Sequence, residues 1–262
     1  AFRCFFRTGT LPLKGICLRN MAISVDITQA HTLRNKYVLL EADASMHLPP
    51  NSKGLNSKLI SFVRHAEGIH NAAASDHKDE FYAKLFNSRV LWDSPLTLAG
   101  TEQCEALSVE IERSGLDVDA IFVSPLIRTL QTAVLSFGAS HPKTPMIAQE
   151  MCRERMAVYT SEGRSPTRRL RTLFPQVDFS QVTAAEDEWW PQTETDDQVG
   201  LRGLVFLDWL MAQPYQRIAV VTHSVFLQCL YAEFRATLPE HFHAQRQGFA
   251  ALRTVSACRA TA

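Results

Sequence analysis

The chain has 262 residues, of which 46% are hydrophobic and 21% charged, and its 27 basic residues balance its 27 acidic ones. A balanced chain has no overall field to attract nucleic acid or an anionic membrane, so any attraction for an anion has to be local. No run of about 18 apolar residues occurs, and we expect no membrane-spanning helix. The six cysteines have no C-x-x-C spacing, which favours free thiols over a zinc site or a disulfide framework.

The first 57 residues differ in composition from the rest. Residues 1–20 contain basic but no acidic residues, a bias typical of organelle transit segments, although an extension ahead of a start at Met21 explains it equally well. Residues 42–58, with two adjacent prolines and a glycine, indicate a linker. We expect residues 1–57 to be an extension and linker and residues 58–262 to be the folded domain. The expected location is cytoplasmic, or mitochondrial or plastid if the transit interpretation holds.

From residue 58 onward, short apolar runs alternate with helical patterns. Continuous apolar runs between polar residues are typical of strands covered on both faces of a parallel sheet; they lie at 59–63, 120–123 and 218–221, with weaker runs at 145–149 and 249–255. Apolar residues at helical spacing predict helices, the first two ending at a glycine; these cover 98–114, 126–137, 200–212 and 224–234. This alternation predicts a three-layer α/β/α sandwich with a mostly parallel central sheet.

Charged residues follow the three stronger runs. Arg64 and His65 come directly after the first run, Arg128 lies one helical turn beyond the second, and His223 follows the third. Because ligands of such sheets bind beyond the carboxyl ends of the strands, we expect these side chains to meet. Guanidinium groups bind phosphate oxygens bidentately, and a neutral imidazole is a nucleophile. The sequence therefore predicts a phosphate site at this edge of the sheet.

Five short segments follow one another along the chain in a distinctive order. They are FVRHAEGIHN (62–71), DSPLTLAGTEQ (93–103), VSPLIRTLQTA (123–133), EMCRER (150–155) and VVTHSVFL (220–227). In order and spacing they resemble the motifs of the histidine phosphatase superfamily, in its phosphoglycerate mutase-like branch (branch 1). The resemblance covers about residues 59–255 and implies a phosphoglycerate mutase-like fold. It also implies a phosphatase that hydrolyses phosphomonoesters through a phosphohistidine, with no metal and no cofactor.

The resemblance implies a role for each residue of the site. His65 is the nucleophile that takes the phosphoryl group, His223 donates to that group, and Glu154 protonates the oxygen of the leaving group. Phosphoryl transfer depends mainly on positioning and charge stabilisation, with a general acid for an alkoxide leaving group. The implied phosphate-binding residues are Arg64, Asn71, Arg128 and His223.

Several alternatives stay open. Glu150 competes with Glu154 as the acid, or is a solvated charge at a strand end; Glu154 is preferred because its C-R-E sequence matches the family pattern. Ala66, Ala157 and Val225 stand where the family usually has a smaller residue, and a branched Val225 is expected to narrow the site. A phosphoglycerate mutase with the same site, and a phosphate-binding or scaffold module with impaired catalysis, are therefore alternative functions.

The segment 163–197 lies outside the five motifs. Its first part carries Arg164, Arg168, Arg169 and Arg171, which form either an electropositive rim that attracts a phosphorylated substrate or a solvated helix face. Trp189 and Trp190 are interpreted as packing anchors under a loop, or as part of a lid. We expect this segment to set specificity for a phosphorylated small molecule, with neither nucleic acid nor membrane as a partner. The oligomeric state is left open.

Overall fold

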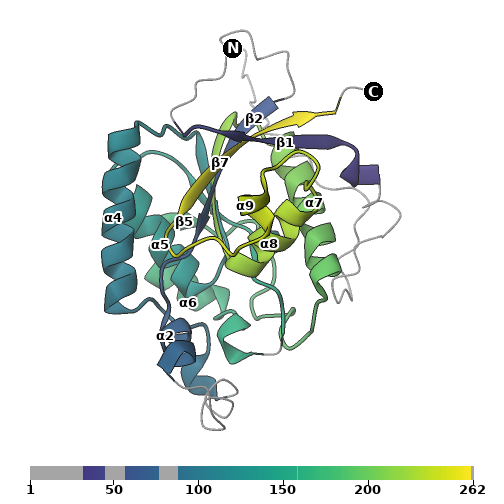
Figure 1. The fold of residues 1–262 in the computed structure, drawn as a ribbon. Helices are drawn as coiled ribbons and strands as arrows, with labels where there is room; N and C mark the ends of the chain where they lie inside the picture. Colours follow the sequence, from purple (N-terminus) through teal and green to yellow (C-terminus); the bar gives the residue numbers. More distant parts are fainter. Residues whose placement is uncertain (1–31, 45–56, 77–87, 158, 261–262) are drawn as a thin grey trace, which may run out of the picture.

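The computed structural model describes residues 32–44, 57–76, 88–157 and 159–260, and within them a seven-stranded sheet forms the centre (Figure 1). The strand order is β1-β7-β2-β6-β3-β4-β5. Five neighbouring strands are parallel: β2 (Ser57–Arg64), β6 (Arg217–Thr222), β3 (Ala120–Val123), β4 (Met146–Ala148) and β5 (Val177–Asp178). The other two, β7 (Leu252–Arg259) and β1 (Tyr37–Ala42), add antiparallel at one side.

Helices cover both faces of this sheet (Figure 1). One face carries α4 (Leu98–Ser114), α5 (Ile127–Phe137) and α6 (Thr167–Leu173); the other carries α7 (Asp196–Ala212), α8 (Ser224–Ala232) and α9 (Glu240–His243). Beyond the end of β2 lies α2 (Ile69–Asp76), and three short 3-10 turns complete the elements: η2 (Arg89–Leu91), η3 (Glu150–Cys152) and η4 (Thr160–Glu162). Of the helices in the described ranges, none is long and apolar enough to cross a membrane.

The alternation of side chains along β3 explains why a continuous apolar run becomes a central strand. Ala120 and Phe122 belong to the apolar cluster shared with α7 and α8, whereas Ile121 and Val123 belong to the cluster shared with α4 and α5. Successive side chains of a strand point to opposite faces, so a strand covered on both sides is expected to be apolar at most positions. The predicted α/β/α sandwich with a mostly parallel sheet is confirmed.

The sheet begins earlier in the chain than the boundary predicted at residue 58. β1 pairs with β7 over its six residues, and its Leu39 side chain is fully buried. The hydroxyl of Tyr37 donates to a carboxylate oxygen of Asp208 in α7, at 2.6 Å. Tyr37 and Leu39 are buried whereas Leu40 is exposed, as expected of an edge strand that packs one face on the core. Residues 1–31 and 45–56, with most of the transit and linker predictions, lie outside the described residues.

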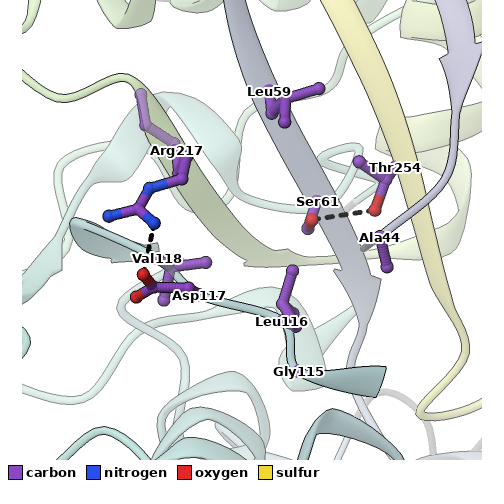
Figure 2. A pocket seen from close by; sticks show the side chains of 10 residues that line it. Ala44, Leu59, Ser61, Gly115, Leu116, Asp117, Val118, Arg217 and Thr254 are labelled. Atoms are coloured by element: carbon purple, nitrogen blue, oxygen red, sulfur yellow. Dashed lines mark hydrogen bonds and ion pairs between the residues drawn. The ribbon is translucent and has the colours of Figure 1, made fainter. Parts of the chain in front are cut away.

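A small cavity lies at the amino ends of β2 and β6 (Figure 2). It is lined by Leu59, Ser61 and Arg217, among others, and the hydroxyls of Ser61 and Thr254 hydrogen-bond at 2.8 Å beside it. With about 10 Å³ it has room for about one water molecule. The carboxyl ends of the same strands, where the predicted phosphate site lies, form the opposite edge of the sheet.

Candidate active site

His65 and His223 follow two neighbouring parallel strands. Arg64 at the end of β2 is in register with Thr222 at the end of β6, and the His65 N–H donates to the Thr222 carbonyl at 2.9 Å. The residue that directly follows each of these two strands is a histidine. The two rings are buried, and their centroids lie 5.1 Å apart. The sheet thus brings together two side chains that are separated by most of the domain.

The hydrogen bonding of His65 defines its tautomer. Its Nδ1 lies 2.7 Å from the carbonyl oxygen of Ala66, which can only accept, so Nδ1 carries the proton. Burial, followed by the positive charge of Arg128, lowers the pKa of His65 well below its ordinary value. The imidazole is therefore neutral near pH 7, and its Nε2 has a free lone pair. This is the state in which a histidine acts as a nucleophile.

His223 lies beside His65 in a similar environment. Its Nε2 is 2.8 Å from the hydroxyl oxygen of Ser124, the residue that follows β3. Burial, followed by the charge of Arg128, lowers its pKa well below the ordinary value. The Ser124 hydroxyl thereby orients a second neutral imidazole next to the first.

Two arginines approach the histidines from different elements. Arg128 lies in the first turn of α5, is almost fully buried, and donates from Nη1 to the carbonyl of Ser161 at 2.7 Å. Arg64 donates from Nη1 to the carbonyl of Gln247 at 2.8 Å, and its guanidinium lies 3.8 Å from the ring centroid of Phe249. Burial lowers the pKa of Arg64 to about 10, so the group still carries its charge at neutral pH.

A third histidine, His70, was missed by the sequence analysis. It lies in the first turn of α2, and its ring centroid is 5.9 Å from that of His65. It is largely buried, and burial followed by the charge of Arg128 lowers its pKa well below the ordinary value. The sequence feature that points to His70 as a site residue is its position between His65 and Asn71, inside the first motif.

Four nitrogens in this cluster have no hydrogen-bond partner among the described residues. They are Nε of Arg64, Nε of Arg128, Nδ1 of His70 and Nδ1 of His223. Buried polar atoms without a partner are rare in folded proteins, because each costs free energy. Two cations and two imidazoles beside a nucleophilic nitrogen suit a tetrahedral oxyanion such as a phosphoryl group. The described residues include no group of three His, Cys, Asp or Glu that could hold a metal ion.

Glu154 reaches the same region from the segment after η3. Its Oε1 accepts the N–H of Phe226 at 2.9 Å, and its Oε2 accepts the N–H of Val225 at 3.3 Å. Both N–H groups belong to the first turn of α8, directly after His223. The negative charge of Glu154 also acts on Arg64 and Arg128, whose pKa values it raises against the effect of burial. The structure therefore places a carboxyl group beside the histidine and arginine cluster.

The family model of the histidine phosphatase superfamily (branch 1) matches residues 60–259. The chain belongs to this superfamily. It is 34% identical over 200 residues to phosphoglycerate mutase-like protein 1 of Arabidopsis thaliana, a match that covers 65% of this chain and 69% of that protein. A phosphoglycerate mutase-like protein of the same plant is 31% identical over 208 residues, covering 68% of this chain and 74% of that protein.

Solved structures of low identity share the fold. The ecdysone phosphate phosphatase from Bombix mori has a TM-score of 0.54 and 14% identity, over 75% of this chain and 88% of that one. A phosphoglycerate mutase from Bacillus anthracis has a TM-score of 0.51 and 17% identity, over 77% of this chain and 88% of that one. Its membership of the superfamily makes the protein an enzyme of the phosphatase or phosphotransferase kind.

In this member of the superfamily, Glu150 and Arg164 do not have the environments that the sequence suggested. The carboxylate of Glu150 lies 2.7 Å from Nε of Arg164 and 3.0 Å from Nη1 of Arg153, so it is an ion-pair partner rather than a solvated charge. Arg164 is fully buried and also donates to backbone carbonyls, which removes it from the predicted rim. The other three arginines of that segment, Arg168, Arg169 and Arg171, are exposed. Arg164 is buried because it pairs with a distant acid, a contact that composition does not reveal.

Glu162 is a second carboxyl group that the sequence analysis missed. Its Oε2 accepts the N–H groups of Ala157 and Tyr159, at 2.6 and 3.2 Å. Burial raises the pKa of Glu162 to about 7, and the negative charge of Glu154 adds to the shift. Glu154 and Glu162 are therefore two neighbouring carboxyl groups at this site, and the pKa of Glu162 lies near neutral pH.

Three further residues from the sequence analysis lie close to the site. Asn71 accepts the Gly68 N–H on its side-chain oxygen at 3.0 Å, which fixes the turn between His65 and α2. Val225 is buried in the apolar cluster of α7 and α8, so its branched side chain packs in the core while its N–H holds Glu154. Ala157 donates its N–H to Glu162.

The two tryptophans of the 163–197 segment are packing anchors, the first of the two interpretations. The ring of Trp190 lies edge-on to Trp92 with centroids 4.8 Å apart. Trp189 lies against two buried cations, the guanidinium groups of Arg153 and Arg202, at 5.5 and 5.7 Å. The segment is thus attached to the loop that carries Glu154.

Proposed function

We propose that this protein hydrolyses small phosphomonoesters through a phosphohistidine on His65, without a metal ion. The observation that carries the proposal is the hydrogen bond from His65 Nδ1 to Ala66, which leaves Nε2 free as a nucleophile. Around this nitrogen, the unpartnered nitrogens of Arg64 and Arg128 supply charge for the phosphoryl oxygens. The unpartnered Nδ1 atoms of His70 and His223 complete the binding of the phosphoryl oxygens.

The reaction has two steps. In the first, His65 Nε2 attacks phosphorus, the bond from phosphorus to the ester oxygen breaks, and Glu154 gives a proton to that oxygen. In the second, Glu154 takes a proton from water, the water oxygen attacks the phosphohistidine, and inorganic phosphate leaves with His65 neutral again. The guanidinium groups of Arg64 and Arg128 stabilise the charge on the transferred group in both steps.

A phosphoglycerate mutase is the second candidate, because the curated relatives carry mutase-like names. A mutase has to bind a substrate that bears a carboxylate as well as a phosphate, and this requires cations beyond those that hold the phosphate. Arg153, Arg164 and Arg202, which lie near the Glu154 loop, are all occupied in buried ion pairs. Arg246 is exposed and its charge acts on Arg64, so it is the cation that a mutase would use for the carboxylate. The hydrolase is the first candidate because it needs only a phosphoryl site and access for water.

The test is the release of inorganic phosphate from para-nitrophenyl phosphate in the presence of a chelator. The wild type should turn over, and His65→Ala should lower kcat by about 10⁴-fold or more, as loss of a nucleophile does. His141→Ala is the matched control. His141 lies beyond the carboxyl end of α5, away from Arg128, and hydrogen-bonds to the Leu116 carbonyl, so this variant should keep full activity.

Two results would overturn the proposal. A wild type that releases no phosphate but interconverts 2-phosphoglycerate and 3-phosphoglycerate is a mutase. A folded wild type that binds vanadate and catalyses neither reaction is a phosphate-binding module.

A further inference from the structure

The backbone that carries Glu154 is held by side chains rather than by a neighbouring strand. Thr222 donates from its hydroxyl to the carbonyl of Cys152 at 2.6 Å. The guanidinium of Arg202, in α7, donates to three more carbonyls of the same segment, those of Met151, Arg153 and Glu154, at 2.7, 2.9 and 3.2 Å. Four successive carbonyl groups of this segment are therefore fixed by two side chains.

The remaining donors of Arg202 bind one carboxylate. Its Nε and Nη2 donate to the two oxygens of Glu194, each at 2.8 Å, and both side chains are almost fully buried. Glu194 is itself tied to the loop, because its Oε2 accepts the Met156 N–H and its own N–H donates to the Met156 carbonyl. All five N–H groups of Arg202 thus have acceptors, and three of these acceptors are the carbonyls of Met151, Arg153 and Glu154.

Aromatic rings fix the plane of this guanidinium. The Arg202 guanidinium carbon lies 5.2 Å from the ring centroid of Phe226 and 5.7 Å from that of Trp189. The N–H of Phe226 donates to the Glu154 carboxylate. The backbone and the carboxylate of Glu154 are therefore held by groups that touch one another.

We propose that Arg202, oriented by Glu194, is a positioning residue that holds Glu154 where its carboxyl group can protonate the leaving oxygen. This inference rests on the proposed phosphatase function. A buried ion pair adds little net stability over apolar residues, so five well-directed donors at this place point to a demand for geometry. Misplacing a reacting group by about 1 Å can cost about 10²-fold in rate.

The dependence of the rate on the leaving group separates positioning of an acid from general support of the fold. Para-nitrophenolate is a stable anion and leaves without a proton, whereas the alkoxide of glycerol 1-phosphate has to be protonated as it leaves. Arg202→Lys keeps a positive charge for Glu194 but has too few donors for three carbonyls. We expect kcat to fall by about 10-fold to 100-fold with glycerol 1-phosphate and by less than about threefold with para-nitrophenyl phosphate.

A control variant and a double variant make the experiment specific. Arg164→Lys is the matched control, because Arg164 is equally buried and also pairs with a glutamate and backbone carbonyls, but with none between residues 151 and 154. Arg164→Lys should change kcat by the same factor for both substrates. In a Glu154→Gln background, Arg202→Lys should cause no further loss with glycerol 1-phosphate, because the group that it positions is gone.

A fall by equal factors on both esters, or a further loss in the Glu154→Gln background, would show that Arg202 only supports the fold. If Arg202→Lys does not fold, as judged by circular dichroism, Glu194→Gln should show the same leaving-group dependence. A wild type that hydrolyses neither ester would overturn the proposed function and this inference together. A wild type whose activity needs His65, combined with a uniform effect of Arg202→Lys, would overturn the inference alone.

Discussion

The rings of His65 and His223 lie with centroids 5.1 Å apart because each histidine follows the last residue of one of two hydrogen-bonded parallel strands. Their separation is therefore defined by the spacing of β2 and β6 and by the hydrogen bond from the His65 N–H to Thr222. Functional groups on regular elements are held more precisely than groups on loops. In the proposed mechanism the nucleophile His65 directly follows a strand of the sheet, whereas the proposed acid Glu154 lies on a loop whose carbonyls are held by Arg202.

The stability of the fold should depend on pH through the buried histidines. Burial lowers the pKa of His65, His70 and His223 well below about 6.5, so the unfolded chain binds more protons than the folded one below that pH. Their contribution to the free energy of unfolding is complete above pH 6.5 and falls as the pH drops toward 5. Urea unfolding should show His70→Asn losing less stability than the wild type over this range, by up to about 1.4 kcal/mol per pH unit. Parallel curves for the two proteins would contradict this.

Binding of inorganic phosphate should need His70. Its Nδ1 is buried without a partner beside two arginines, and a hydrogen bond to a phosphate oxygen would satisfy it. Loss of one such bond is expected to cost about 1.5 kcal/mol, close to a tenfold rise in Kd. Calorimetric titration of His70→Ala with phosphate measures this, with His141→Ala as the control that keeps the wild-type Kd. An unchanged Kd for the His70 variant would place this histidine outside the phosphate site.

Replacement of Glu162 should stabilise the protein at alkaline pH. Burial raises the pKa of Glu162 to about 7 from an ordinary value of 4.5, so the folded state binds the extra proton and loses stability as the pH rises from about 5 to 8. Gln keeps an oxygen that can accept the N–H of Ala157 but carries no charge. We expect Glu162→Gln to raise the free energy of unfolding by about 1–2 kcal/mol at pH 8 and by much less at pH 5. Equal shifts at the two pH values would mean that ionisation of Glu162 is not the cause.

A methyl group at Gly100 should disturb the loop behind His65. A Cβ there would lie 2.2 Å from the carbonyl oxygen of Glu67, so the backbone after His65 or the start of α4 would have to move. We expect Gly100→Ala to lower the free energy of unfolding by about 1–3 kcal/mol, the usual cost of overpacking. The variant should also slow turnover, since the same backbone carries His65. Gly248→Ala is the control, because a Cβ there meets only Ala251 at an ordinary 3.7 Å. Equal melting temperatures for the two variants would contradict the prediction.

The sequence by itself determined the layers of the domain and the core of its site. Runs such as 120–123 are short and mostly apolar, as is typical of strands covered on both faces, so β2, β3 and β6 could be predicted from the local sequence. Helix α4 ends at Gly115, whose φ of 65° is one that glycine adopts at low cost. Arg64, His65 and His223 follow from the same logic, since the ends of parallel strands meet at one edge.

Tertiary structure alone decided which of the other charged groups belong to the site. Arg164 and Arg202 are both arginines in charged surroundings, and their burial depends on Glu150 and Glu194, which lie at distances along the chain that no periodicity encodes. His70 and Glu162 acquire their shifted pKa values from burial and from charges that only folding brings near. Local propensity and hydrophobic period act over a few residues, whereas ion pairing and desolvation depend on neighbours in space. For that reason the proposed nucleophile, His65, could be predicted from the sequence, and the network around the proposed acid, Glu154, could not.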